Sequence, residues 1–270
     1  IEEIATAFLT TKSTINKRLT RGKARLRTEM NTLELPPDNE LPTRMSTVIK
    51  TLYLLFNEGY HSTSTDRHFR EELCADAIRL SVLLTENKRT NTSDINALLA
   101  LMCFQASRFQ ARMSNTGEMI DYDEQDRSLW DLRLIKQGKI FLSRATAKGE
   151  TGRYQLEAAI AMLHTATVEQ VEKWPNILSL YNRLLQVAYS PIAALNRTYA
   201  FSRVHGAQLA LTEALKIDLR GHIAFHLLLG KLYEELGDTN SAKEHYKQCV
   251  QLTKNPSVIR QLEQKILDLV

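Results

Sequence analysis

The side chains with the clearest chemical potential form a cationic segment at the start of the chain. Residues 1–28 contain seven Lys and Arg residues but two Glu, which gives this segment a net charge of +5. The whole chain carries +4, so the other 242 residues together carry −1. Such a concentration of cations predicts a polyanionic partner for this segment alone. A solvated charged helix face is the alternative, and charge by itself does not separate the two interpretations.

The residues around these cations predict a helix-turn-helix. A short amphipathic stretch over residues 2–9 precedes Thr11, whose hydroxyl can cap a second helix that runs from about Lys12 to Thr28. The apolar residues of that helix share one face and are Ile15, Leu19 and Leu26. The other faces carry the residues that could contact DNA, which are Lys12, Ser13, Asn16, Lys17, Arg18, Arg21 and Arg25. A basic second helix after a tight turn is typical of domains that place it in the major groove, and a surface helical hairpin is the alternative.

Other clusters of reactive residue types are expected to be structural. His222 and His226 have the spacing of zinc ligands, but no nearby Glu or Cys completes a set, so His226 is expected to be a packed core residue. One acidic run lacks the order and the central Gly of a calcium loop and is expected to be a solvated loop or a partner surface for a basic helix, namely Asp121, Asp123, Glu124 and Asp126. A Gly-rich phosphate loop and a G-x-S-x-G motif are both missing. We therefore predict no catalytic residue, no metal site and no cofactor, and we expect the protein not to be an enzyme.

Two further segments combine polar and aromatic residues. Asn57–Tyr60, which is followed by Asp66 and Arg67, could form a polar ligand pocket. A helix end closed by Gly59 as its C′ residue is the favoured interpretation of that segment. The segment Glu124–Trp130 is expected to tie the middle helices of the chain to its first helical repeat.

The composition predicts an all-α globular protein. The 270 residues include 10 Gly and 6 Pro, roughly half the average share, and no stretch sustains the two-residue alternation of a β-strand. The longest apolar run, Ala97 to Phe104, is far below the roughly 20 residues that span a bilayer, and no secretion leader opens the chain. Three cysteines are an odd and sparse set, which suits free buried thiols in the cytoplasm. We therefore predict a cytoplasmic protein with no membrane partner.

The pattern along the chain predicts four segments. Residues 1–28 form part of a helix-turn-helix, and residues 29–41 form a linker, because two consecutive prolines cannot lie inside a helix. Residues 42–123 form a helical middle domain, and residues 124–270 form a stacked α-helical array. Helices are expected at about 42–57, 66–85, 93–113, 127–147, 154–164, 174–187, 191–204, 207–216, 222–236, 239–252 and 256–268. A short β-hairpin is possible around Asn115–Gly117.

A tetratricopeptide-like signature lies near the end of the chain and consists of Leu229, Gly230, Tyr233, Ala242 and Tyr246. The two small residues allow two helix backbones to approach, and the two tyrosines fill the remaining space. One repeat length of 34 residues earlier, Leu195 and Tyr199 occupy equivalent positions. The second helix of that earlier unit does not match cleanly, so we expect a degenerate array.

Residues 2–27 resemble the end of region 4 of an extracytoplasmic-function-type RNA polymerase sigma factor. The motifs that carry the resemblance are Glu3-Ile4-Ala5, Thr11, Thr14-Ile15 and Arg18-Leu19-Thr20-Arg21-Gly22. Six later segments resemble, in order, the long helical extension that one group of these sigma factors carries behind region 4. They are LYLLFNEGY (52–60), LCADAIRL (73–80), ALLALM (97–102), EQDRSLWD (124–131), YQLEAAIA (154–161) and SPIAALNR (190–197).

The resemblance implies the C-terminal part of an alternative sigma factor whose second helix reads the −35 promoter element. It places Asn16 and Lys17 at base edges and Arg18 and Arg21 at phosphates. The implied partners are promoter DNA, the RNA polymerase core and a regulatory protein or peptide on the helical repeats. A tetratricopeptide-like scaffold or adaptor without sequence-specific DNA binding is the alternative.

The resemblance also implies a fragment, because region 2 and the first part of region 4 should precede Ile1. This chain alone should therefore not initiate transcription. Several apolar side chains would then lack part of their core, namely Phe8, Ile15, Leu19 and Leu26. We expect residues 1–28 to pack on the helical body or on a second molecule, and exposure of all four side chains would contradict this.

Overall fold

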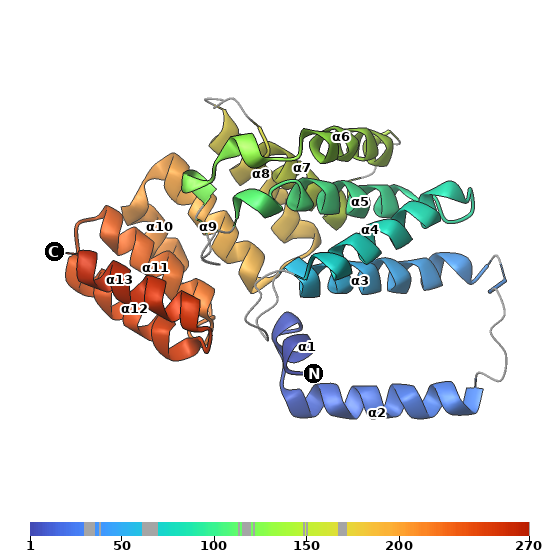
Figure 1. The fold of residues 1–270 in the computed structure, drawn as a ribbon, viewed down its shortest axis with the longest axis horizontal. Coiled ribbons are helices and arrows are strands. Elements are labelled where there is room, and N and C mark those ends of the chain that lie inside the picture. Colours follow the sequence, from blue (N-terminus) through green and yellow to red (C-terminus); the bar gives the residue numbers. More distant parts are fainter. Residues whose placement is uncertain are drawn as a thin grey trace. The chain divides into compact units, whose positions relative to one another are not determined.

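The computed structural model describes the chain except for residues 30–35, 38, 61–69, 113, 115–119, 121, 148, 150, 167–171 and 270. The described residues form thirteen α-helices, three short 3-10 helices and no strand, which confirms the expected all-α class (Figure 1). The hairpin expected around Asn115–Gly117 lies outside the described residues, as does most of the expected linker. The chain divides into two compact units, Ile1–Ile95 and Asn96–Val270.

The first unit contains four helices. α1 (Glu2–Ala7) contacts α2 (Lys12–Glu29), and α3 (Leu41–Tyr60) packs along α4 (Glu71–Glu86). The buried side chains of α3 recur every three or four residues, as one helix face requires, and include Met45, Ile49, Leu52, Phe56 and Tyr60. The α3–α4 pair is therefore held by one apolar stripe.

The end of α3 differs from the expectation that Gly59 closes the helix. The helix continues through Tyr60, and Gly59 is buried within it without a left-handed φ. A Cβ atom at Gly59 would lie 2.6 Å from the Cys74 Sγ and 2.7 Å from the Arg70 carbonyl oxygen. The C-cap prediction is therefore wrong, because this glycine instead permits the start of α4 to approach α3. Asp66 and Arg67 lie outside the described residues.

The second unit begins with a buried α-helix and three short 3-10 helices. α5 (Ser93–Ala106) crosses the boundary between the units, and all of its residues from 95 to 104 are buried, so this helix is buried on every side. The short helices η1 (Phe109–Ala111), η2 (Tyr122–Glu124) and η3 (Arg127–Leu129) follow. The Asp131 carboxylate then caps α6 (Leu132–Thr146) by accepting from the Arg133 and Leu134 N–H groups at 2.8 and 3.2 Å.

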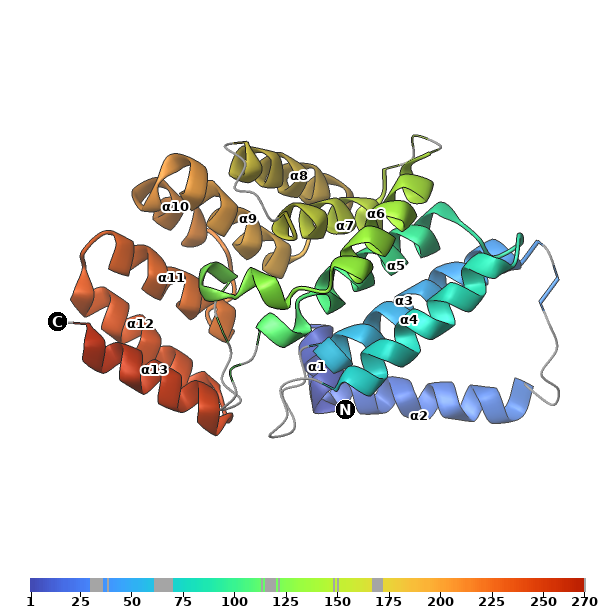
Figure 2. The ribbon, with the colours of Figure 1, turned by 45° about the horizontal axis from the view of Figure 1, so that its top comes forward.

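The rest of the second unit is a stack of helices in which each contacts the next along the chain (Figure 2). These are α7 (Arg153–His164), α8 (Lys173–Val187), α9 (Pro191–His205), α10 (Ala207–Ala214), α11 (Ile223–Glu235), α12 (Thr239–Leu252) and α13 (Pro256–Asp268). Side chains that accept from backbone N–H groups start several of them, among them Ser190, Asp238 and Asn255. Contacts between neighbours are typical of a helical repeat array.

The tetratricopeptide-like signature has the packing predicted for it. A Cβ atom at Gly230 of α11 would lie 2.5 Å from the Tyr246 ring of α12, so the two helices meet at this point. Tyr246 is 1% exposed, and Leu229 and Ala242 are equally buried. Leu195, one repeat length earlier, lies in the same apolar cluster as Leu229. The signature therefore marks a true helical hairpin.

Candidate nucleic-acid interface

The turn between α1 and α2 orients α2 through local bonds. The Thr11 hydroxyl accepts from the Thr14 N–H at 3.2 Å, so Thr11 caps α2 as predicted. The Lys12 Nζ lies 2.6 Å from the Glu2 Oε1 and links the two helices. Ala5 and Ile15 are buried, at 6% and 3% exposure. These contacts give α2 a defined start and a defined inward face.

All seven residues predicted to contact DNA lie on the exposed surface of α2. At about 100° per residue, Ser13, Lys17 and Thr20 lie opposite the apolar stripe. One flank then carries a row of cations, Arg18, Arg21 and Arg25, and the other carries Asn16, Lys23 and Arg27. A polar centre between two flanks that both carry cations is the arrangement a helix needs to lie between the two phosphate backbones of a groove, and in this arrangement Asn16 lies on a flank and not at the centre.

The charge of α2 is of one sign over most of its length. Residues 12–28 contain seven Lys and Arg residues and no acidic residue, since Glu29 is the acid that ends the helix. Lys12 is paired with Glu2, whereas Lys17, Arg18 and Arg21 form no ion pair within the described part of the chain. The helix is 18 residues long, so this cationic surface extends about 27 Å. Such a surface concentrates a polyanion.

The apolar side chains of residues 1–28 are covered in part. Ile15 is buried, but Phe8 and Leu19 are each 37% exposed and Leu26 is 56% exposed. The Lys50 Nζ of α3 lies 5.5 Å from the centre of the Phe8 ring. Of the four apolar side chains, Ile15 is therefore covered, whereas the other three are exposed, and the burial does not extend along α2 to Leu26.

A second group of polar and aromatic side chains lies in the second unit, and we call it the aromatic–cation joint. It comprises Arg108, Tyr122, Trp130, His164, Lys173 and Trp174. Lys173 is 6% exposed, and its Nζ donates to the Tyr122 hydroxyl at 2.6 Å. The Lys173 Nζ and the Arg108 guanidinium lie 4.5 and 4.7 Å from the centre of the Tyr122 ring. Two cations thus share one aromatic ring.

His164 is the centre of this joint. Its ring contacts Tyr122 and Trp174 edge-on, with centroids 5.1 and 5.7 Å away. Burial, together with the nearby charges of Arg108 and Lys173, lowers the pKa of His164 to about 3. The imidazole is therefore neutral at pH 7. Its Nδ1 is buried with no hydrogen-bond partner among the described residues.

The joint connects η2 and η3 to the first helices of the array. The Tyr122 hydroxyl donates to the His164 carbonyl at 3.0 Å, and the Trp130 ring lies 6.5 Å from that of Tyr122. The contacts to α7 and α8 are thus made by Tyr122, which precedes the segment Glu124–Trp130, and Trp130 of that segment contacts Tyr122. Sequence reasoning missed Tyr122, His164 and Lys173, because no local spacing links residues so far apart in the chain.

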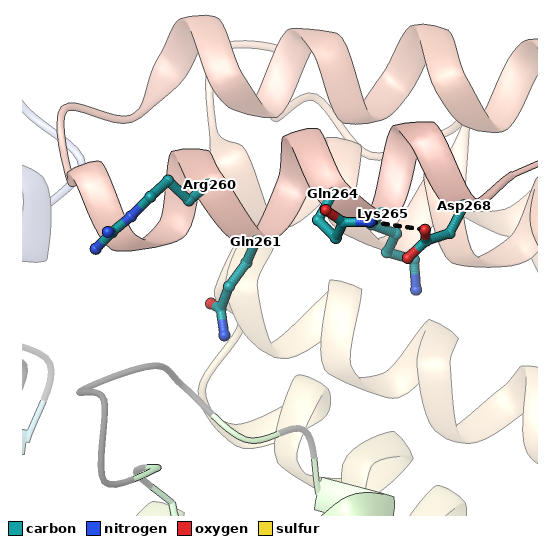
Figure 3. Close-up of a pocket in the computed structure, with 5 residues that line it drawn as sticks. All are labelled: Arg260, Gln261, Gln264, Lys265 and Asp268. Atoms are coloured by element: carbon teal, nitrogen blue, oxygen red, sulfur yellow. Dashed lines mark hydrogen bonds between the residues drawn. The ribbon is translucent and has the colours of Figure 1, made fainter.

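A shallow polar hollow of about 480 Å³ lies on α13 (Figure 3). Its side chains extend from one face of the helix, and the Gln264 Nε2 donates to the Asp268 Oδ1 at 2.8 Å. Lys265 pairs with Glu234 of α11 at 3.1 Å. The charge of Lys265 is thus balanced by a residue outside the hollow.

The fold defines an all-α protein with a helical repeat array at its C-terminal end. Residues 44–146, from α3 to the end of α6, match a family model described as a family of unknown function (DUF6596). Residues 223–256, which hold α11 and α12, match the tetratricopeptide repeat. α1 and α2 lie outside both matches, and neither match names a sigma factor.

An uncharacterized protein from Rhizobium meliloti (strain 1021) is 34% identical over 261 residues, which make up 95% of this chain. The chain spans 61% of the length of that relative. Each described helix is too short or too polar to cross a lipid bilayer. The comparisons thus support a helical scaffold with a tetratricopeptide repeat, the second of the two functions expected from the sequence, better than the first.

Proposed function

We propose that this chain is the C-terminal part of an alternative sigma factor that acts in the cytoplasm. In this proposal α2 binds promoter DNA, and the helical remainder regulates sigma activity through contacts with RNA polymerase and with a regulatory protein or peptide. The observation that carries the DNA-binding half is the uniform positive charge of α2 on both flanks of an exposed polar face. The tetratricopeptide match supports the protein-contact half, because repeat arrays bind partner proteins. The mechanism involves binding and no chemistry.

The side chains of α2 suit two kinds of DNA contact. Asn16 and Lys17 have the donors and acceptors that discriminate adenine and guanine edges in the major groove. Arg18 and Arg21 lie on the flank of the helix, where a guanidinium reaches phosphate oxygens. Ser13, in the first turn of α2, can donate to a base edge or to a phosphate oxygen. Phosphate contacts should set the affinity, and base contacts should set the sequence preference.

The experiment selects binding sites for the full chain from a random duplex library and then measures affinity for the selected duplex by fluorescence anisotropy. Asn16→Ala and Lys17→Ala should change the selected sequence. Arg21→Ala should weaken binding to all duplexes and reduce the salt slope by about 1. Lys88→Ala, which removes an exposed cation between α4 and α5, is the matched control and should change neither.

Unchanged selection by Asn16→Ala and Lys17→Ala would reject base recognition by α2. A salt slope that falls equally in Arg21→Ala and Lys88→Ala would show that any surface cation serves, and would reject α2 as the DNA-binding helix.

A tetratricopeptide-like scaffold without sequence-specific DNA binding is the second candidate, and the match over residues 223–256 favours it. This candidate predicts sequence-blind, weak binding to DNA and tight binding to a protein or peptide. The selection experiment separates the two, because a scaffold enriches no sequence.

A further inference from the structure

Two imidazoles meet between the helices of the tetratricopeptide hairpin. The Nδ1 atoms of His226 on α11 and His245 on α12 lie 3.0 Å apart, and His226 is 9% exposed. The His226 Nε2 lies 2.8 Å from the Arg220 carbonyl oxygen. The His245 ring stacks on Tyr233 with centroids 5.5 Å apart and an angle of 10° between the planes. The pair therefore links both helices to the segment that precedes α11.

The hydrogen positions follow from the partners of His226. A carbonyl oxygen can only accept, so the His226 Nε2 carries a hydrogen. In the neutral ring the His226 Nδ1 then carries no hydrogen, and it accepts a hydrogen bond from the Nδ1–H of His245. The Nε2 of neutral His245 therefore carries no hydrogen. The tautomers of both residues are thus determined by one backbone carbonyl.

The pair can accept one proton and keep its hydrogen bond. The first added proton goes to the bare His245 Nε2, and the Nδ1–H of His245 still donates to His226. A second added proton would place hydrogens on both Nδ1 atoms, 3.0 Å apart, and two positive rings side by side. No hydrogen bond can form between the two Nδ1 atoms in that state. This hydrogen bond between α11 and α12 therefore depends on the number of protons that the pair holds.

The surroundings of the pair give the second proton little compensation. Burial is the main factor that lowers the pKa of His245, the charge of His226 adds to it, and Glu244 opposes it. α9 and α10 present apolar side chains to α11, while their Arg197 and Glu213 pair with each other at 3.4 Å. From α13, Lys265 is paired with Glu234. Neither imidazole forms an ion pair within the part of the chain that the structure describes.

We propose that the His226–His245 pair is a pH-sensitive latch in the tetratricopeptide hairpin. It holds α11 to α12 while the pair carries at most one added proton, and it releases them when both rings are protonated. Acid therefore loosens the surface that repeat arrays use to bind partners. This inference does not depend on DNA binding by α2.

Nitrogen-15 NMR of the full wild-type chain tests the tautomers without any substitution. At pH 7.5 we expect His226 with its hydrogen on Nε2 and His245 with its hydrogen on Nδ1. The pair should take up its two added protons in two separate macroscopic steps, because the second proton would place hydrogens on both Nδ1 atoms. Hydrogens on Nε2 of both rings, or two independent titrations near the ordinary pKa of about 6.5, would overturn the proposal.

Amide hydrogen exchange of α11 and α12 between pH 6.5 and pH 4.5 tests the latch itself, after correction for intrinsic exchange. If the opened hairpin takes up one proton at the ordinary pKa of about 6.5 and the latched state excludes that proton, its opening equilibrium should rise about 50-fold over these two pH units. In His245→Asn, the amide nitrogen can replace Nδ1 but does not titrate, so this rise should disappear. His222→Asn removes a histidine of the same hairpin that lies outside the pair. Burial also lowers the pKa of His222, so this variant should lose only the share of the rise that His222 contributes and should keep the share of the pair. A rise of equal size in all three proteins would overturn the latch.

Discussion

The contact between Gly230 and Tyr246 gives the sharpest test of the packing in the repeat array. In Gly230→Ala the new methyl group would lie 2.5, 2.8 and 2.9 Å from three atoms of the Tyr246 ring. That ring cannot move aside easily. It is 1% exposed, and its hydroxyl donates to the Glu234 Oε2 at 2.7 Å. The substitution should therefore separate α11 from α12.

Two opposing effects set the change in stability that Gly230→Ala should cause. Adding a methyl group to a packed core costs about 1–3 kcal/mol, and Ala regains about 1 kcal/mol over Gly in a helix interior. Because the ring is held at its hydroxyl, we expect a net destabilisation of about 1–2 kcal/mol. Gly22→Ala is the matched control. Gly22 lies inside exposed α2 with nothing within 4 Å of its Cβ position, so the same change should stabilise that helix by roughly 0.5–1 kcal/mol.

Hydrogen exchange of the amides of α11 and α12 in the full chain measures this local stability. The expected loss corresponds to roughly 5- to 30-fold faster exchange at these amides. In a Tyr246→Leu background the ring is gone, so Gly230→Ala should become stabilising by about 1 kcal/mol. If it destabilises the hairpin equally in both backgrounds, or stabilises it as Gly22→Ala does, the close approach does not limit this position.

Acid should lower the free energy of unfolding of the second unit, because buried His164 is neutral in the folded state and takes up a proton near pH 6.5 in the unfolded state. The contribution of His164 to stability is complete above pH 6.5 and is lost as the pH falls toward 3. Thermal unfolding at a series of pH values measures the loss, and His164→Gln should flatten the dependence. Thr11→Ala should fray the first turn of α2 at a cost of about 1 kcal/mol, seen as faster exchange of its amides, while Thr20→Ala in the middle of α2 should not. Gly59→Ala should lower the melting temperature more than Gly230→Ala does, because its methyl group would meet a backbone carbonyl.

Local signals determined the helices of the repeat array. The expected ranges 239–252 and 256–268 coincide with α12 and α13. Asp238 and Asn255 cap the N-termini of these helices, and Pro256 occupies the first position of α13, so the start of each helix is encoded by neighbouring residues. The expected helix over 93–113 was too long, because the chain leaves α5 at Ala106. The exposed polar and cationic faces of α2 were likewise predictable from its spacing.

The contacts between distant residues were decided by the tertiary structure. The sequence predicted a buried His226, but it contained no sign that His245 would face it from the next helix. Nor did any spacing indicate that Lys173 would lie on Tyr122, 51 residues away. The physical reason is the range of the interactions. Periodicity and capping act within a few residues and are visible in the sequence, whereas partners across helices are set by how the helices pack.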